Sequence, residues 1–506
     1  MAAYLFRAPE PPLPWDGTRS AKEHGPICHQ FDSTSMTLKP GSEDCLYLNV
    51  YTPSLGQSSL LPVMVWIHGG AFMCGSGNDD FYGPDFLIEK EIILVTFNYR
   101  LEAVGFLCLD NENVPGNAGM KDQVAVLRWV HKNIKRLGGD PENVTIFGHS
   151  AGAASVCYHL VSPMTKGLFK RAIVQSGSMH CHWAQCIEPR ERALAIARGL
   201  GYEGTNDEDL YEFYKNVSIE CLVSTHKPIT MADSVCVDVE LACSVVSEKQ
   251  FENIERFFYG NVYERLREGI HDNVEILVGY TAEEAAIFVS IIEGHIEKTY
   301  NNYLESFAPA LVRRYCKISD QLEVGRKMKN YYFGKDQVNI NNAINIIDYY
   351  SMAFFVFGTI QFIKFQAKRK VNKTYLYKFN CRLDRNFMTK HFKPSNVASV
   401  DKPVAAHTDE LAYLFPIKEA KLPLNQNSQS FSVIQNMTKL WTDFAKFGNP
   451  TPDESLGVKW SPYSLELEDY LEVIAFERKH RFLIKRRRCV VRNDLLTPSH
   501  SKEAAR

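Results

Sequence analysis

The stretch Val144-Thr145-Ile146-Phe147-Gly148-His149-Ser150-Ala151-Gly152 places a serine between two glycines, directly after an apolar β-branched run. The run favours a strand, and the alanines at 151, 153 and 154 favour a helix behind it. A tight strand-to-helix turn crowds the backbone two residues before and after its apex, so both positions need glycine and the apical hydroxyl is exposed. Ser150 is therefore a candidate nucleophile, although Gly-x-Ser-x-Gly alone also arises by chance.

Apolar runs of strand length recur along the chain and alternate with helical patterns. Between the second and third of them, apolar residues from Val124 to Ile134 recur at spacings of three and four, which is one face of a helix. This alternation predicts an α/β fold with a large, mostly parallel central sheet flanked by helices. The predicted strands are 63–67, 92–97, 144–147, 172–175, 275–278, 374–379 and 473–476.

Two long segments, 188–269 and 293–369, are polar and rich in helical patterns but contain no clear strand. We expect them to be helical insertions over the sheet that cap a pocket, although ordinary surface helices give the same pattern. No Pro-, Gly- or Ser-rich linker and no repeat divides the 506 residues, so we expect a single domain over residues 1–506.

Composition and charge exclude several classes of function. The chain is 45% hydrophobic, as is ordinary for a globular protein, and its net charge of −2 gives no electrostatic footprint for nucleic acid or an anionic membrane. The basic run Lys485–Arg488 is interpreted as a solvated surface. No apolar run reaches the roughly 18 residues of a transmembrane segment. The best one, Met352–Ile363, is interrupted by Gly358, Thr359 and Gln361.

The 13 cysteines are an odd number, scattered over the chain without a Cys-x-x-Cys pair or a Cys/His cluster of zinc spacing. We therefore expect no metal site and no framework that uses every cysteine in a disulfide. The N-terminus shows no signal-peptide pattern. As the chain stands we expect a cytoplasmic protein, or a secreted one if a further segment precedes it; the oligomeric state is left open.

A serine nucleophile needs a base, an acid that orients the base, and donors for the oxyanion that forms. In a doubly wound sheet these groups gather at the carboxyl ends of strands. Gly69-Gly70 follows the first predicted strand and offers bare backbone N–H groups. Glu283 and Glu284 both follow a later strand, and their position leaves the choice between them open. His407, one of 15 histidines, lies in a small-residue loop at the right place in the chain for the base.

Three stretches together resemble the type-B carboxylesterase family of carboxylesterases, cholinesterases and catalytically silent adhesion relatives: Ser42–Val50, His68–Phe72 and Gly138–Val156. The resemblance covers nearly the whole chain and is strongest to insect carboxylesterases of the detoxifying or odorant-degrading kind. It implies the α/β-hydrolase fold, with helical insertions over an active-site gorge, and ester hydrolysis through an acyl-enzyme without a cofactor. Cholinesterase activity is not expected, because the loop from Cys28 to Cys45 contains no tryptophan to hold a choline cation.

The resemblance also assigns roles to individual residues. It implies that Ser150 is the nucleophile, His407 the base, and Glu284 rather than Glu283 the acid. It implies a disulfide between Cys28 and Cys45 in an oxidising compartment. It further implies that the backbone N–H groups of Gly70, Ala71 and Ala151 form the oxyanion hole. Ser176 is implied to be a serine that supports the site, and Trp183 a wall of the acyl pocket.

The sequence thus predicts a serine hydrolase that cleaves small carboxylic esters and is phosphorylated at Ser150 by organophosphate-type inhibitors. The alternatives are a slow esterase that sequesters toxicants and a non-catalytic binding relative. The chain keeps all three triad residues, which favours an enzyme. Glycosylation is also predicted at four Asn-x-Ser/Thr sites, the first poorly accessible because it precedes a core strand: Asn143, Asn216, Asn372 and Asn436.

Overall fold

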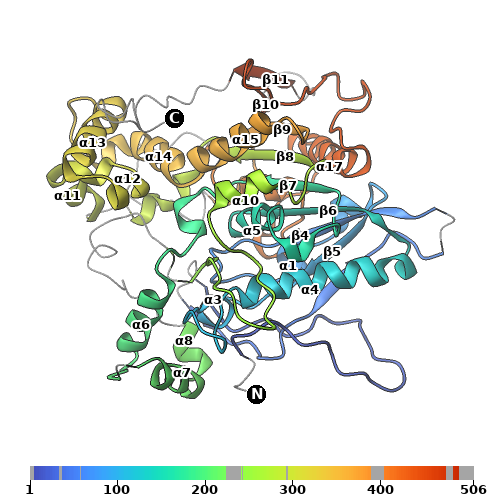
Figure 1. Cartoon of the computed structure of the whole chain (residues 1–506). Helices are drawn as coiled ribbons and strands as arrows, with labels where there is room; N and C mark the ends of the chain where they lie inside the picture. Colours follow the sequence, from blue (N-terminus) through green and yellow to red (C-terminus); the bar gives the residue numbers. More distant parts are fainter. Residues whose placement is uncertain are drawn as a thin grey trace.

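The computed structural model describes residues 5–32, 37–56, 59–204, 206–223, 241, 243–291, 295–388, 404–474 and 483–488. These residues form a central nine-stranded sheet in the order β11-β10-β9-β8-β7-β6-β4-β5-β3 (Figure 1). A separate hairpin pairs β1 (Gln30–Asp32) with β2 (Thr37–Lys39). The strands of the sheet are β3 Leu48–Tyr51, β4 Leu61–Ile67, β5 Ile93–Phe97, β6 Gly139–His149, β7 Arg171–Gln175, β8 Glu275–Thr281, β9 Thr374–Phe379, β10 Asp469–Ile474 and β11 Leu483–Arg488.

The predicted α/β class and all seven predicted strands are confirmed; the last two positions of the final predicted strand, 475–476, lie outside the described residues. The sheet is parallel from β5 to β10, and an antiparallel strand, β3 or β11, closes each edge. Both edge strands escaped prediction. The basic run Lys485–Arg488 lies within β11, so it is an edge strand as well as a charged segment.

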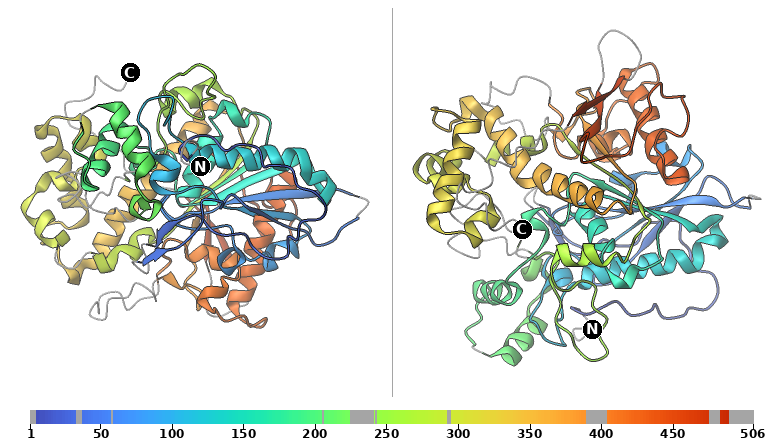
Figure 2. Two further views of the ribbon diagram at one scale, coloured as in Figure 1. Left: turned by 90° about the horizontal axis from the view of Figure 1, so that it is seen from below. Right: turned by 45° about the horizontal axis from the view of Figure 1, so that its top comes forward.

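Helices cover both faces of the sheet, which explains why its strands are apolar runs rather than alternating patterns. Along β4, Val63 and Val65 pack into one core together with α4 (Ala118–Asn133) and α5 (Ala151–His159). Met64 and Trp66 point the other way, into a second core with α17 (Gln429–Phe447). The left view in Figure 2 shows α4 and α17 on opposite sides of the sheet.

The predicted helical insertions are present: α11 to α14 lie to one side of the sheet, α6 to α8 form a separate group below them in Figure 1, and α15 packs against β8 and β9 (Figures 1 and 2). One helical run, 340–369, is long and apolar enough to cross a bilayer by length and composition. However, 72% of its most apolar window is buried inside the protein, as in a core helix. The insertion helices are α6 Pro189–Gly199, α7 Asp207–Asn216, α8 Ile219–Val223, α10 Val262–Glu268, α11 His295–Asn302, α12 Ala310–Tyr315, α13 Ile318–Tyr332, α14 Ala343–Ser351 and α15 Phe357–Arg369.

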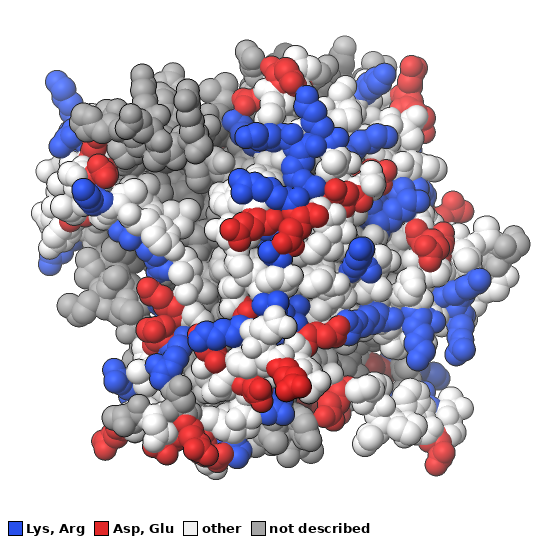
Figure 3. All heavy atoms as spheres, in the orientation of Figure 1, with Lys and Arg blue, Asp and Glu red and all other residues white. Residues whose placement is uncertain are grey.

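Charges of both signs are interspersed on the face shown in Figure 3, where basic side chains border directly on acidic ones. Lys364 pairs with Glu468 at 2.8 Å, and Arg369 pairs with Asp272 at 2.6 Å. Partly exposed pairs of this kind add little stability. The mixture of signs on the face in Figure 3 gives no uniform basic surface for a polyanion.

The chain reverses its direction of travel across the sheet at β4, because β5 lies on one side of β4 and β6 on the other. In open α/β sheets the ligand site lies beyond the carboxyl ends of the strands at such a switch point. The turn Gly69-Gly70 follows β4 and Ser150 follows β6, so both lie at this position.

The backbone is tightly packed around Ser150. β4 and β6 are parallel neighbours, with Ile67 beside Gly148. A Cβ added to Gly148 would lie 2.6 Å from the carbonyl oxygen of Gly152, and one added to Gly152 would overlap the carbonyl oxygen of Ile67. Ser150, at the apex, has φ 58° and ψ −122°, a conformation that L-residues rarely adopt. The expected strand-to-helix turn is therefore present, with glycines where it is most crowded.

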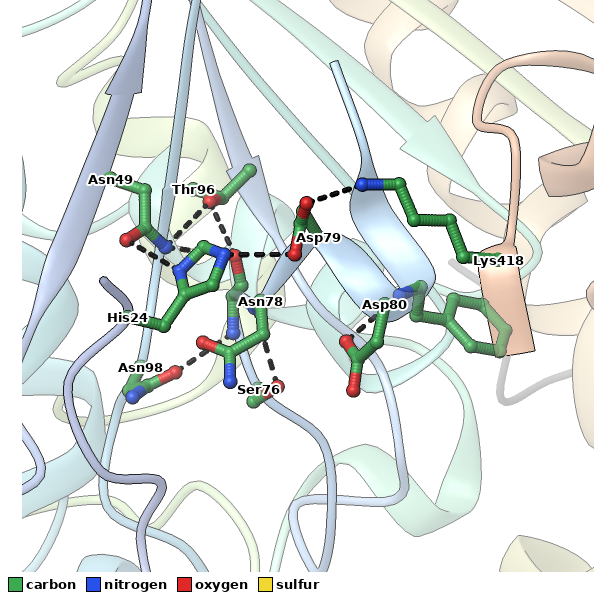
Figure 4. Close-up of polar contacts among 11 residues, drawn as sticks. His24, Asn49, Ser76, Asn78, Asp79, Asp80, Thr96, Asn98 and Lys418 are labelled. Atoms are coloured by element: carbon green, nitrogen blue, oxygen red, sulfur yellow. Dashed lines mark hydrogen bonds and ion pairs between the residues drawn. The ribbon is translucent and has the colours of Figure 1, made fainter. Parts of the chain in front are cut away.

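The N-terminal segment is held to the sheet by a surface network (Figure 4). His24 contacts Asn49 Oδ1 through Nδ1 at 3.0 Å and Asp79 Oδ1 through Nε2 at 2.9 Å. Asp79 opens α1 (Asp79–Tyr82) and also accepts from Lys418 Nζ. A disulfide joins Cys28 to Cys45, as the resemblance implied. Segments far apart in the sequence are thus tied together near the first strands.

We expect replacement of Cys28 by serine to destabilise the protein. The disulfide spans a sequence separation of 17. Closing a loop of this size lowers the entropy of the unfolded chain, which raises the free energy of unfolding by about 3 kcal/mol. Urea unfolding of Cys28→Ser and wild type under non-reducing conditions measures the difference. Cys316→Ser, at a partly exposed cysteine outside the disulfide, serves as the control. Equal unfolding midpoints for Cys28→Ser and wild type would contradict the expectation.

Gly152→Ala should distort the turn that carries Ser150, because its Cβ overlaps the Ile67 carbonyl oxygen. Overpacking of this kind costs about 1–3 kcal/mol, and we expect kcat/KM for an aryl ester to fall at least about tenfold as the serine moves. Gly199→Ala is the matched control, since nothing lies within 4 Å of a Cβ added there. Similar activity and stability of the two variants would refute this account of the turn.

Candidate active site

Ser150 is fixed by its backbone on both sides. Its N–H donates to the carbonyl oxygen of Gln175 on β7 at 2.9 Å, and its own carbonyl oxygen accepts from Ala154 of α5 at 3.0 Å. The residue itself is only partly buried. Its hydroxyl-bearing carbon is therefore held at the end of the sheet while one side stays accessible.

The glycine turn after β4 lies directly against Ser150. A Cβ added to Gly69 would lie 3.1 Å from Ser150 Cβ. Beyond it the chain keeps positive φ through Gly70 (107°), Ala71 (55°) and Phe72 (58°). The Gly70 carbonyl oxygen accepts from Met73 and Cys74, which folds the turn back on itself. Two predicted oxyanion donors, Gly70 and Ala71, thus lie on a turn next to the serine, and the third, Ala151, is the residue after it.

His407 and Glu284 form a buried pair. His407 Nδ1 lies 2.6 Å from Glu284 Oε2, and the other carboxylate oxygen accepts from the backbone N–H of Thr281 at 2.7 Å. The backbone N–H of His407 donates to the carbonyl oxygen of Glu284 at 3.2 Å. This arrangement fixes the imidazole ring through Nδ1 and leaves Nε2 outside the contact with Glu284.

The neighbouring Glu283 has a different role. Its Oε2 accepts from the backbone N–H of Ala405 at 2.8 Å, its Oε1 pairs with Arg382, and its backbone bridges to Ala406. Glu283 therefore tethers the loop that carries His407 to the end of β8. The structure separates the two carboxylates that their sequence position left open: Glu284 contacts the histidine and Glu283 contacts the loop.

Two aromatic rings flank the imidazole of His407. The ring of His149 lies 4.3 Å away between centroids at an angle of 41°, and that of Phe355 lies 4.4 Å away at 31°. Because His149 directly precedes Ser150, this contact brings the serine turn and the His407 loop together. Neither neighbour was a predicted site residue. His149 stood beside the serine in the sequence, whereas Phe355 lies in an insertion that carried no signal.

A further buried group lies behind these rings. Glu410, in the 3-10 helix η10 (Asp409–Tyr413), has its Oε1 3.8 Å from His149 Nε2 and 3.3 Å from Ser176 Oγ. Burial and the nearby Glu284 raise the pKa of Glu410 well above its usual range. Burial and the neighbouring His407 lower the pKa of His149 well below its usual range. Ser176, predicted to support the site, thus acts on Glu410.

Trp183 lies near the backbone of Ser150. Its Cη2 would lie 3.2 Å from a Cβ added to Gly177, and that same Cβ would meet the Ser150 carbonyl oxygen. The indole N–H donates to the carbonyl oxygen of Phe354 at 2.9 Å, and its ring is 6.0 Å from that of Phe355. The predicted pocket wall is therefore next to the serine and is joined to the insertion helix. Within the described residues, no group of three or more His, Cys, Asp or Glu side chains is placed to hold a metal ion.

Comparison with known proteins agrees with this geometry. The model of the carboxylesterase family matches residues 2–490. The juvenile hormone esterase of Tribolium castaneum is 33% identical over 94% of this chain and 82% of its own length. Esterase B1 of Culex pipiens is 33% identical over 88% of this chain and 81% of its own length.

A solved structure shares the fold across nearly the whole chain. It is that of juvenile hormone esterase from Manduca sexta with OTFP covalently attached, at 25% identity and a TM-score of 0.83. The match covers 97% of this chain and 91% of that one. The fold, the buried His407–Glu284 pair beside the Ser150 turn, and these relatives agree: the chain is an α/β-hydrolase and a serine carboxylesterase that belongs to the carboxylesterase family.

Proposed function

We propose that Ser150, His407 and Glu284 form a catalytic triad that hydrolyses carboxylic esters through an acyl-enzyme. The observation that carries the proposal is the buried 2.6 Å contact of His407 with Glu284 beside the strained turn of Ser150. Ser150 Oγ attacks the ester carbonyl carbon, and His407 Nε2 takes the hydroxyl proton and returns it to the leaving alcohol. Water then attacks the acyl-enzyme by the same route and releases the acid.

The oxyanion of each tetrahedral intermediate would be held by the backbone N–H groups of Gly70, Ala71 and Ala151. The closeness of Gly69 to Ser150 supports this role, because it puts the turn within reach of the attacked carbonyl. Donors fixed by the backbone need no reorganisation when charge develops, and this makes them effective.

For the substrate, we propose small esters with an apolar acyl group. Trp183 and Phe355, both buried, border the serine and the histidine and offer apolar surface rather than charge. The relatives named juvenile hormone esterase and Esterase B1 support a role in removing signalling or toxic esters. Organophosphate-type inhibitors would react with Ser150 in the place of an ester.

For the compartment, we propose an oxidising environment. A structural disulfide such as Cys28–Cys45 forms and persists in such environments. This proposal favours the secreted alternative over the cytoplasmic one, and the redox state of the two thiols in protein isolated from its source tests it.

Ser150→Ala should abolish hydrolysis of 4-nitrophenyl acetate, because no other group replaces the nucleophile. Removal of the nucleophilic serine costs about 10⁶-fold in kcat in a well-studied serine hydrolase. An organophosphate such as diethyl 4-nitrophenyl phosphate should add one diethyl phosphate to wild type and none to the variant, as read by intact mass. A slow sequestering esterase would show the same adduct with a burst and slow steady turnover. A binding relative without catalysis would show no adduct on wild type, which would refute the triad.

Glu284→Gln should lower kcat by roughly 10³–10⁴-fold with little change in KM, because the amide cannot hold His407 in the required tautomer. Glu283→Gln is the matched control. Glu283 contacts the loop, so Glu283→Gln should lower the melting temperature while kcat falls far less than in Glu284→Gln. If the two variants exchanged these effects, Glu283 would be the acid.

A further inference from the structure

His149 and Glu410 are a buried pair of titratable groups that the triad mechanism does not use. His149 Nε2 and Glu410 Oε1 lie 3.8 Å apart, which is beyond hydrogen-bond distance. Within the described residues neither His149 Nε2 nor Glu410 Oε2 has a hydrogen-bond partner. Both side chains are almost fully buried, so neither is solvated well enough to carry an isolated charge at low cost.

The surroundings decide where a proton resides. Glu284 accepts from Thr281 N–H and contacts His407, and Asp409 accepts from the N–H groups of Met388 and Ala406 at 3.0 and 2.8 Å. Hydrogen bonds from fixed N–H groups stabilise a carboxylate charge. Glu410 accepts from the Ser176 hydroxyl at a longer 3.3 Å and from its own backbone N–H, and it lies close to Glu284. Burial and the neighbouring Glu284 favour the protonated form of the Glu410 carboxyl.

The side of His149 that faces His407 opposes a charge on His149. The titratable groups facing the pair are His407 from its loop, Glu284 from the end of β8, Asp409 from η10 and Tyr377 from β9. In the triad mechanism His407 becomes a cation at each proton transfer. A second cation with its ring centroid 4.3 Å away would disfavour that step.

We propose that His149 is a positioning residue for His407, and that the His149–Glu410 pair holds one proton on the Glu410 carboxyl so that the His149 ring beside His407 stays uncharged. The proposal rests on the triad proposed above. Glu410 then keeps its proton beside Nε2 of a neutral His149, and this uncharged ring and that of Phe355 both lie against the imidazole of His407. The other side of His149 meets the oxyanion turn, since its Nδ1 would lie 3.4 Å from a Cβ added to Gly69.

The first test compares two replacements of His149 with a 4-nitrophenyl ester. His149→Gln removes the ring, and we expect kcat to fall by about 10–100-fold with KM nearly unchanged, as for a misplaced catalytic group. His149→Phe keeps a ring that cannot be charged and should recover most of that loss. His131→Gln, the same replacement at an exposed histidine of α4, is the control and should retain wild-type kcat. Equal kcat for His149→Gln, His149→Phe and wild type would overturn the positioning role.

The pH profile tests the charge of His149 independently. If the ring is uncharged in wild type, the acid limb of kcat/KM stays at the same pH in His149→Phe. If it is charged, its removal relieves repulsion of the His407 cation, and the limb moves up by about one pH unit. Such a movement would overturn the proposed protonation state.

The proton on Glu410 has its own spectroscopic signature. The infrared difference between wild type and Glu410→Gln at neutral pH should contain the carbonyl stretch of a protonated carboxylic acid. Glutamine has nearly the shape of that acid. We therefore expect kcat/KM of Glu410→Gln to be at least about tenfold higher than that of Glu410→Ala. Absence of the band, or equal losses in the two variants, would place the proton elsewhere. This measurement decides the question even if His149→Gln does not fold. Wild-type activity in Ser150→Ala would instead remove the triad itself.

Discussion

The close approach of two backbones at the sheet's switch point is the constraint on which the active site depends. β4 and β6 are adjacent parallel strands, and the first turn of α5 begins so near the end of β4 that Gly152 has no space for a side chain. The chain can pass from β6 to α5 in this space only through a sharp turn, and Ser150 takes the unfavourable conformation at its apex. Packing of the two cores on either side of the sheet supplies the stability that holds this strain. The serine is thus presented by the fold rather than by its own conformational preference.

The second constraint is the attachment of the His407 loop to β8. Two adjacent glutamates at the end of that strand have separate roles, since Glu283 binds the loop's backbone and Arg382, whereas Glu284 binds the imidazole. The loop begins at residue 404 of the described chain and has little regular structure, so these contacts fix its position relative to β6. Glu283 fixes the loop and Glu284 fixes the ring. Together they define the position of His407, which lies far along the chain from Ser150.

Much of this could be predicted from the sequence because the decisive features are local. Buried parallel strands are continuous apolar runs, and the turn around Ser150 needs glycine at positions that the sequence itself shows. The edge strands β3 and β11 were missed because β3 is short and only partly buried and β11 is basic, so neither has the pattern of a core strand. The choice between Glu283 and Glu284 could not be made from the residues alone, since both follow the same strand. The resemblance favoured Glu284, and the hydrogen bonds give the physical reason.

The parts of the site that escaped prediction are those that depend on distant packing, and Phe355 shows why. Between α14 and α15 the helix makes a π-helical turn, Met352–Val356, which inserts an extra residue into the normal helical spacing. Carbonyl groups in that turn are used outside the helix: Phe354 accepts from the Trp183 indole, and Phe355 accepts from the Cys181 thiol at 3.8 Å. The same turn points the Phe355 ring at His407. A helical period read from the sequence assumes regular spacing and so cannot place these side chains. The π-turn consequently links Trp183, which lies near the backbone of Ser150, to the imidazole of His407.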